Sequence, residues 1–368
     1  MKVRIGYDAS FSVNNYRGMG VFMNAFKNVL LQYPDIEIKG LSCYETSEDG
    51  IKKTGSTIYP LWEQISLPLY LRKNKPDIFI FPYNTMPWFV PRSIYKVLIL
   101  HDLIFLEKKY GTKQTFKQFI GKHYRKFLVR RAYRKADVII TVSEHSKKNM
   151  LNLLGAKSKI YVIPNVVKKQ LEYTGKTEKT ANNYLLNIGG EAPSKNVFTL
   201  IAAYCLLPEK LINDYQLKLV GNYSGSFIKA AQDHLQKKNI PANRIEFTGY
   251  VSDDTLSQLY CQCSAFIFPS LFEGFGIPVI EAIQYEKPLL ASNTSCIPEI
   301  AGKCALYFDP LSVDDIKNKI EFVLSDDYQF NDYKKYYKEQ LQKFSFAEFE
   351  KKVRALIDDE ILNNSIGL

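Results

Sequence analysis

Short apolar runs alternate with helical stretches along almost the whole chain, and this alternation limits the possible folds strongly. The runs expected as strands lie at 3–7, 36–42, 78–81, 97–100, 138–142, 160–163, 184–188, 216–220, 245–247, 265–268, 288–291 and 305–308. Helices are expected at 22–32, 116–134, 145–154, 200–206, 227–238, 254–261 and 279–285. Near-continuous apolar strands separated by helices are typical of parallel sheets covered on both faces. Two such series predict an α/β protein with two Rossmann-like, doubly wound domains.

The length of 368 residues agrees with two domains of ordinary size. A polar stretch without periodicity, KKQLEYTGKTEKTANN, follows the first series of strands and indicates the boundary. We expect a first domain at 1–170, a second at 171–345, and a C-terminal helix at 346–368 that packs back toward the first domain. Ligands of open parallel sheets bind beyond the carboxyl ends of the strands, so the cleft between the domains is the expected site.

The chain carries a net charge of +11, which implies an anionic partner such as a phosphate, a nucleic acid or an acidic lipid. Its six cysteines form no C-x-x-C pair, and we expect reduced thiols in a cytoplasmic protein. The sequence opens on an expected strand rather than on a signal peptide, and no apolar run is long enough to span a bilayer. Any membrane contact is therefore expected to be peripheral, on the inner face of the cell membrane.

The segment FPSLFEGFGIPVIEA at 268–282 is the most informative part of the sequence. A strand ends near Phe268, Gly274 and Gly276 permit a tight turn, and a helix is expected to begin near Pro278. The N-terminus of such a helix attracts phosphate or a polarised sugar oxygen. Glu273 precedes the turn, and we place Glu281 in the first turn of the helix. The same residues also fit a plain turn residue and a carboxylate that complements the helix dipole.

The spacing Glu273-Gly-Phe-Gly-x-Pro-x-x-Glu281-Ala282 resembles the E-x7-E signature of glycosyltransferase family 4, whose members are retaining enzymes with the GT-B fold of two facing Rossmann-like domains. The resemblance extends over most of the chain. It includes Gly18-Met-Gly20, His101-Asp102, the stretch 131–144, Ile163-Pro-Asn165, the loop 189–196 and the loop 247–253.

The resemblance implies a role for each matching residue. Lys195 pairs with the donor diphosphate, Glu273 holds the donor sugar, and His101 lies at the reaction centre. The expected donor-binding residues are Gly18, Gly20, Phe275, Gly276, Ile277, Glu281, Tyr250 and Val251, with Glu281 on the ribose hydroxyls and the last two beside the nucleobase. By residue type alone, a loop lysine can equally be solvated, and a histidine at a strand end is often structural.

One position departs from the family, because many members carry an arginine where this chain has Gly190. A second cationic contact to the phosphates is therefore absent or supplied elsewhere, and Arg17 is a candidate substitute. Lys195 and a helix N-terminus can stabilise the departing diphosphate electrostatically, so we expect neither a metal nor a cofactor. No strand in the sequence ends in the D-x-D that a metal-dependent transferase uses, and Asp253-Asp254 resembles a helix N-cap and first turn.

The stretch from Lys108 to Lys135 is rich in lysine and arginine and contains no acidic residue. Aromatic and aliphatic residues recur within it at helical spacings, which suits an anionic membrane surface. The residues expected to contact the membrane are Lys117, Lys122, Arg125 and Lys126. Two other interpretations stay open: a solvated helix whose apolar stripe, including Phe127, Leu128 and Arg131, faces the core, and a nucleic-acid-binding face.

Together, these features favour a retaining hexosyltransferase that moves a sugar from a nucleotide-sugar donor to a glycan acceptor, expected to be lipid-linked, in surface polysaccharide synthesis. The partners are then the donor, the acceptor and an anionic membrane surface, and not nucleic acid. The alternative is a non-catalytic nucleotide- or membrane-binding protein with a degenerate GT-B shell, which the glycine at 190 favours. A basic nucleic-acid-binding protein rests on charge alone, because the sequence contains no recognition module.

Overall fold

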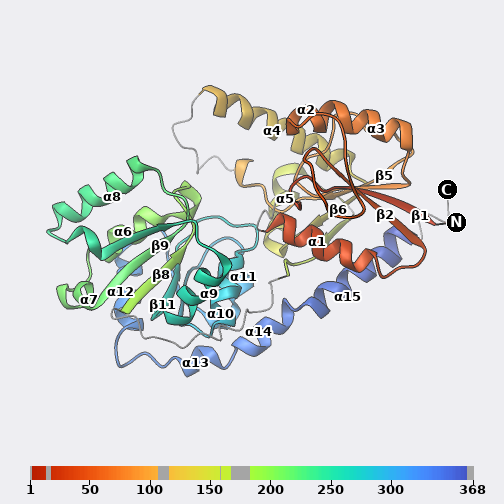
Figure 1. Ribbon diagram of the computed structural model, residues 1–368. Helices are drawn as coiled ribbons and strands as arrows, with labels where there is room; N and C mark the ends of the chain where they lie inside the picture. Colours follow the sequence, from red (N-terminus) through yellow and green to blue (C-terminus); the bar gives the residue numbers. More distant parts are fainter. Residues whose placement is uncertain (1, 14–17, 107–115, 158, 167–182, 363–368) are drawn as a thin grey trace. The chain divides into compact units, whose positions relative to one another are not determined.

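The computed structural model describes residues 2–13, 18–106, 116–157, 159–166 and 183–362, with the backbone alone for Phe105 and for residues 116–125. The chain divides into two compact units, which Figure 1 shows. The first unit comprises Met1–Val166 together with Phe344–Leu368, and the second comprises Val167–Lys343.

The first unit is built on a seven-stranded parallel sheet in the order β3-β2-β1-β4-β5-β6-β7. Its strands are β1 (Val3–Asp8), β2 (Ile36–Ser42), β3 (Ile51–Lys53), β4 (Ile78–Phe81), β5 (Tyr95–Ile99), β6 (Val138–Thr141) and β7 (Ile160–Val162). The central strands β4 and β6 are buried along their whole length, as expected for a sheet covered on both faces. The strand order reverses between β1 and β4, which creates a topological switch point.

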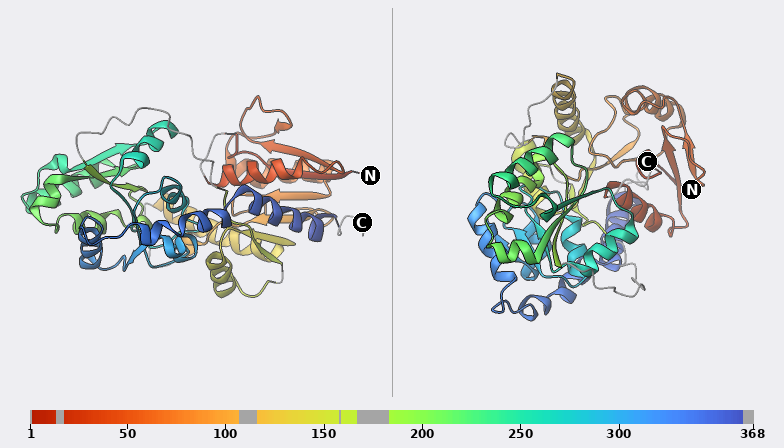
Figure 2. Two further views of the ribbon diagram at one scale, coloured as in Figure 1. Left: turned by 90° about the horizontal axis from the view of Figure 1, so that it is seen from below. Right: turned by 60° about the vertical axis from the view of Figure 1, so that its left-hand side comes forward.

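Helices cover both faces of this sheet, as Figures 1 and 2 show. They are α1 (Met19–Leu30), α2 (Tyr59–Leu61), the π-helix η1 (Trp62–Ser66), α3 (Leu67–Asn74), the 3₁₀ turn η2 (Ile104–Leu106), α4 (Phe116–Lys135) and α5 (Glu144–Leu154). Large side chains from α3, α4 and α5, such as Leu71, Tyr133 and Met150, form one core with β4, β5 and β6. Phe22 and Phe26 of α1 are fully buried as well.

The C-terminal helices α15 (Phe346–Leu356) and η7 (Ile357–Leu362) belong to the first unit and pack beside α1. Phe349 meets Phe22 edge to face, with ring centroids 5.4 Å apart. The buried carboxylate of Glu360 accepts hydrogen bonds from Tyr95 (2.8 Å), Lys159 (2.7 Å) and Tyr161 (2.7 Å). A buried carboxylate needs such compensation, so this cluster holds the C-terminal segment against the first sheet.

The second unit contains a six-stranded parallel sheet in the order β10-β9-β8-β11-β12-β13, with its switch point between β8 and β11. Its strands are β8 (Asn183–Ile188), β9 (Tyr215–Val220), β10 (Ile245–Gly249), β11 (Ala265–Phe268), β12 (Leu289–Ser292) and β13 (Leu306–Phe308). Its helices of eight or more residues are α6 (Val197–Tyr204), α8 (Gly225–Lys237), α9 (Asp253–Gln262), α10 (Ile277–Gln284) and α12 (Val313–Val323). The shorter helices are η4 (Pro193–Lys195), α7 (Glu209–Asp214), η5 (Ala242–Arg244), α11 (Ile297–Ala301), η6 (Gly302–Cys304), α13 (Asn331–Lys334) and α14 (Tyr337–Lys343).

The predicted fold class is confirmed, and the structure corrects several details. Strand β3 and the helical stretch from Tyr59 to Asn74 were not predicted. Ser252, rather than an aspartate, is the N-cap of α9, because its hydroxyl accepts a hydrogen bond from the N–H of Thr255.

All six cysteines are free thiols. Within the described residues, no helix has both the length and the apolar character of a bilayer-spanning segment.

Candidate functional site

The loops that follow β8 and β11 meet at the switch point of the second sheet, where open parallel sheets bind ligands. Hydrogen bonds join these two loops. The N–H of Leu271 donates to the carbonyl of Ser194 over 2.7 Å, and the side chain of Asn196 donates to the carbonyl of Pro269 over 3.2 Å. Asn196 also holds a left-handed backbone conformation, which is a sparsely populated one for a residue other than glycine. The two loops therefore form one connected platform.

Two of the predicted catalytic residues, Lys195 and Glu273, face each other on this platform. The Nζ of Lys195 lies 2.7 Å from the Oε1 of Glu273. The side chain of Lys195 is 31% exposed and that of Glu273 is 13% exposed. The pair is thus partly desolvated yet reachable, which strengthens its charges toward a ligand. The ammonium group of Lys195 has three N–H donors, so it can bind an incoming anion beside its contact with Glu273.

Ser295, which the sequence analysis did not single out, fixes the backbone of Glu273. The N–H of Glu273 donates to the Ser295 hydroxyl over 3.0 Å, and that hydroxyl donates to the Glu273 carbonyl over 2.9 Å. Ser295 adopts a positive φ of 60°, and strain of this kind concentrates at functional sites. Asn187 contributes from β8, because its side-chain amide donates to the carbonyl of Ile267 in β11 over 2.9 Å.

Helix α10 begins directly after the Glu273 turn. Its N-cap is Gly276, whose φ of 87° only glycine adopts readily, while Pro278 lies in the first turn. Phe275 is buried, so its side chain packs into the unit, and Ile277 is the first residue of the helix. The expectation that Glu281 lies in the first turn is wrong. Since the helix begins at Ile277, Glu281 lies one turn further along, too far from the N-terminus to serve mainly as a dipole partner.

Tyr260 of α9 orients Glu281. Its phenol donates to the Oε2 of Glu281 over 2.8 Å, and its ring stacks on Tyr285 at 5.1 Å with an interplanar angle of 6°. Tyr260 is fully buried, and burial first, then the neighbouring Glu281, raises the pKa of its phenol well above the usual value. The phenol therefore stays protonated and serves as a fixed donor that sets the rotamer of Glu281.

Tyr250 and Val251 follow β10, an edge strand separated from β8 by β9. Neighbouring strands lie about 4.8 Å apart, so the strand that leads to these residues lies about 10 Å from β8, the strand that precedes Lys195. Tyr250 exposes 70% of its surface. The role of these two residues beside the nucleobase stays a prediction.

The other predicted residues lie in the first unit. Gly18 is the N-cap of α1 with a φ of 81°, and a Cβ on Gly20 would lie 2.9 Å from the carbonyl oxygen of Phe11, so neither position tolerates a side chain easily. His101 follows β5 and is buried. Burial lowers the pKa of its imidazole to about 4, against a hydrogen bond to the backbone of Pro82, and its Nε2 has no partner among the described residues.

The switch point of the first sheet contains a buried carboxylate that the sequence analysis missed. Asp8, the last residue of β1, accepts hydrogen bonds from the N–H of Ser10 (2.9 Å) and the phenol of Tyr59 (2.9 Å). Phe11 packs between the rings of Tyr59 and Tyr83, with centroid distances of 4.7 and 4.6 Å. Burial raises the pKa of Asp8 to about 7 despite these hydrogen bonds.

We expect Asp8→Asn to stabilise the protein at pH 8 and to change its stability little at pH 4. Asp8 has an ordinary pKa of 3.8 and a folded pKa of about 7, so the folded state binds more protons between these values and stability falls as pH rises. The loss approaches a few kcal/mol above pH 7, and an amide, which accepts from Ser10 and bonds Tyr59, avoids it. Urea unfolding at both pH values measures the difference; equal shifts at pH 4 and pH 8 would contradict a role of ionisation.

The side chains of Lys117, Lys122 and Arg125, and the whole of Arg17, lie outside the described residues. Lys126 is half-buried. In the last turns of α4, Leu128 is buried as the core-facing interpretation requires, but Phe127 is 54% exposed, so that interpretation is wrong for Phe127. Arg131 lies over the indole ring of Trp88, 4.0 Å from its centroid, rather than in the core.

Comparison with known proteins gives two family matches that together span most of the chain. Residues 169–343 match the family described as "Glycosyl transferases group 1", and residues 49–171 match "Glycosyltransferase Family 4". Among curated relatives, the O-antigen chain mannosyltransferase B of Escherichia coli is 30% identical over 70% of this chain and 68% of that protein. The serotype-specific mannosyltransferase WbdA of Escherichia coli is 27% identical over 72% of this chain.

The match covers 33% of the length of WbdA, so this chain spans about a third of that protein.

Among solved structures, HepE of Anabaena in complex with UDP-glucose has a TM-score of 0.72 and 15% identity, and the match covers 96% of this chain and 99% of that one. At this level of identity the likeness establishes a common fold.

Proposed function

The chain belongs to the glycosyltransferases of family 4, and from this premise we propose that it is a retaining hexosyltransferase of surface polysaccharide synthesis. It moves a sugar from a nucleotide-sugar donor to a glycan acceptor, which we propose is lipid-linked. The mannosyltransferase names of its relatives and the UDP-glucose bound to HepE support a hexose donor.

The observation that carries the proposal is the Lys195–Glu273 pair at the switch point of the second sheet. Breaking the anomeric C–O bond leaves negative charge on the departing diphosphate and positive character on the sugar ring. In this proposal Lys195 stabilises the leaving anion, and Glu273 offers a carboxylate to a sugar hydroxyl and to the developing cation. One partly desolvated pair thus provides both signs of charge that the transition state requires.

We further propose that transfer needs no metal ion. The support is chemical, because Lys195 and the N-terminus of α10 supply the positive potential that a divalent ion would otherwise give to the diphosphate. His101 acts as a neutral imidazole, since its pKa of about 4 keeps it uncharged at neutral pH.

The donor is tested by thermal unfolding of the purified protein with UDP, GDP and dTDP, followed by a screen of the matching nucleotide sugars for hydrolysis or transfer. We expect one nucleoside diphosphate to raise the unfolding temperature and its hexose derivative to be consumed. Single-stranded DNA, at the same concentration of phosphate groups as the nucleotides, serves as the control for nonspecific binding of anions to the basic surface. Stabilisation by DNA alone would refute the proposal.

Tyr260→Phe is expected to reduce the preference of the protein for a ribonucleotide over its 2′-deoxy analogue. The phenol that holds Glu281 is lost while the ring and its stacking on Tyr285 remain, so the carboxylate binds the ribose diol less well. Loss of one hydrogen bond to a charged group corresponds to about a tenfold weaker affinity for the ribonucleotide. Calorimetric titration with both nucleotides measures the ratio, and an unchanged ratio would show that Tyr260 has only a packing role.

A further inference from the structure

The exposed face of the helical stretch from Tyr59 to Asn74 is apolar. Ile58, Leu61, Ile65 and Leu69 follow one another at helical spacing and are between 47% and 63% exposed. The opposite face is fully used, because Trp62, Leu67 and Leu71 lie in the core. We call the four exposed residues the apolar stripe. Contiguous exposed apolar residues of this kind mark an interaction site.

Trp88 connects the apolar stripe to helix α4. Its backbone N–H donates to the side chain of Gln64, between two stripe positions, over 2.9 Å. Its carbonyl accepts two hydrogen bonds from the Arg131 guanidinium, at 2.7 and 3.2 Å, and its ring stacks on Phe127 at 5.0 Å. Trp88 and Phe127 are nevertheless 49% and 54% exposed, and so is Phe89, at 59%. The hydrogen bond to Gln64 therefore places these exposed aromatic rings beside the helical stretch that bears the stripe, and we call the stripe and the rings together the apolar surface.

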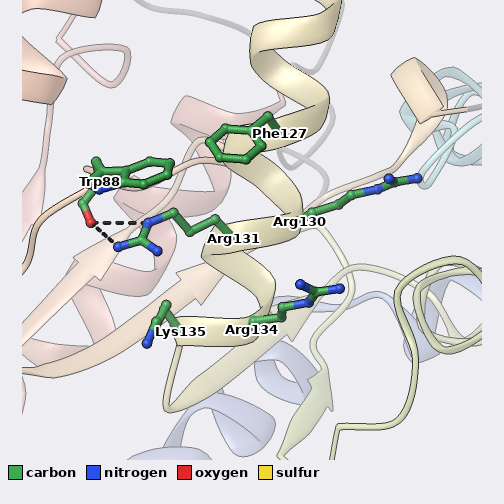
Figure 3. Close-up of a pocket in the computed structure, with 6 residues that line it drawn as sticks. All are labelled: Trp88, Phe127, Arg130, Arg131, Arg134 and Lys135. Atoms are coloured by element: carbon green, nitrogen blue, oxygen red, sulfur yellow. Dashed lines mark hydrogen bonds between the residues drawn. The ribbon is translucent and has the colours of Figure 1, made fainter.

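Cations border this surface along the last turns of α4. Arg130, Arg131, Arg134 and Lys135 line, with Trp88 and Phe127, a surface pocket of about 410 Å³. Figure 3 shows the two rings side by side, Arg131 bonded to the Trp88 carbonyl, and Arg130 and Arg134 reaching away from the rings. Among the described residues, no carboxylate forms an ion pair with Arg130, Arg134 or Lys135. Their charge is therefore available to an external anion.

No acidic side chain offsets these cations on the neighbouring helix. The only acid between Tyr59 and Asn74 is Glu63, which is buried and accepts a hydrogen bond from Thr85. An apolar surface bordered by unpaired arginine fits the interface of an anionic bilayer, where tryptophan and aliphatic side chains enter the headgroup region and guanidinium groups bind phosphate. A second copy fits less well, because a symmetric contact would bring like charges together.

We propose that the apolar stripe, Trp88, Phe89 and Phe127 insert into an anionic phospholipid surface, while Arg130, Arg134 and Lys135 bind its phosphate groups. This proposal assigns the expected membrane association to particular residues. It rests on the proposed function only in that a lipid-linked acceptor lies at a membrane. It differs from the basic-helix expectation because most of the apolar contact comes from residues outside α4, namely the stripe, Trp88 and Phe89, and salt does not screen that contact.

The test is co-sedimentation of the full chain with vesicles of phosphatidylcholine and phosphatidylglycerol, at low salt and at about 1 M salt, where charges are screened beyond about 3 Å. The apolar variant is Leu61→Ser with Leu69→Ser, and its control is Leu31→Ser, an exposed leucine at the C-terminal end of α1 in the same unit. The charge variant is Arg130→Gln, Arg134→Gln and Lys135→Gln together, with Lys52→Gln on β3 as its control.

We expect wild-type binding to persist in part at high salt. The apolar variant should bind about tenfold more weakly at both salt concentrations, and the charge variant about a hundredfold more weakly at low salt only. Wild-type-like binding by the apolar variant, or complete release of the wild type by salt, would overturn the proposal. The proposal would also be overturned if the wild type formed a dimer in solution and the apolar variant were a monomer. Nucleotide stabilisation measured without vesicles reports on the proposed function separately.

Discussion

Replacing Lys195 by alanine is expected to lower the rate of sugar transfer about a hundredfold or more while the protein stays folded. The ammonium group lies at the switch point, where the proposed function puts the charge of the departing diphosphate, and removal of one such donor typically costs two to three orders of magnitude in rate. Steady-state transfer with the donor found in the nucleotide-sugar screen measures the effect. The affinity for the nucleoside diphosphate should fall as well, because the same charge contacts the ground state.

The fold should tolerate this change, because a lysine that keeps 31% of its exposure contributes about 1 kcal/mol or less through its ion pair. Lys317→Ala is the matched control, since Lys317 pairs with Glu321 in α12 at 2.9 Å and is 26% exposed. The control should keep wild-type transfer. Near-normal transfer by Lys195→Ala would refute the role of this residue at the leaving group.

Much of the fold was predictable because the strands β4, β6, β11 and β12 are buried along their whole length and alternate with helices. Strand β4, for example, was predicted with its observed bounds of Ile78–Phe81. Strand β3 was missed because it lies at the edge of the sheet, where Lys52 and Lys53 face solvent and leave no apolar run to detect. The stretch from Tyr59 to Asn74 was missed because it is apolar on two faces, so its helical periodicity is hidden.

The site was predictable where chemistry is carried by neighbouring residues, and not where distant segments meet. The spacing of Glu273 and Glu281 is visible in the sequence, whereas the contact of Lys195 with Glu273 joins residues 78 positions apart. Ser295 gave no signal, because its role depends on a positive φ and on a hydroxyl aimed at another loop. Asp8 looked like the ordinary end of a strand, since only the packing of Tyr59 and Tyr83 above it produces its burial.

Glu273→Gln is expected to abolish most of the sugar transfer without weakening the binding of the nucleoside diphosphate. This contrast distinguishes the role of Glu273 from that of Lys195. The amide removes the negative charge that serves the sugar ring, so the rate should fall about a hundredfold. At the same time Lys195 loses its carboxylate partner, 2.7 Å away, so its positive charge is no longer partly neutralised when it binds phosphate. The affinity for the nucleoside diphosphate should therefore stay the same or rise by up to about fivefold, the range of a partly exposed ion pair.

Calorimetric titration of the nucleoside diphosphate, run beside steady-state transfer, decides between two roles for Glu273. The hydrogen bonds of Ser295 go to the backbone of residue 273, so the substitution leaves the loop in place. If Glu273→Gln instead weakens the binding of the nucleoside diphosphate as much as Lys195→Ala does, Glu273 acts by positioning the lysine rather than by holding the sugar. If it keeps the wild-type rate, the carboxylate takes no part in transfer, and the ion pair is only a resting contact of the donor-free protein.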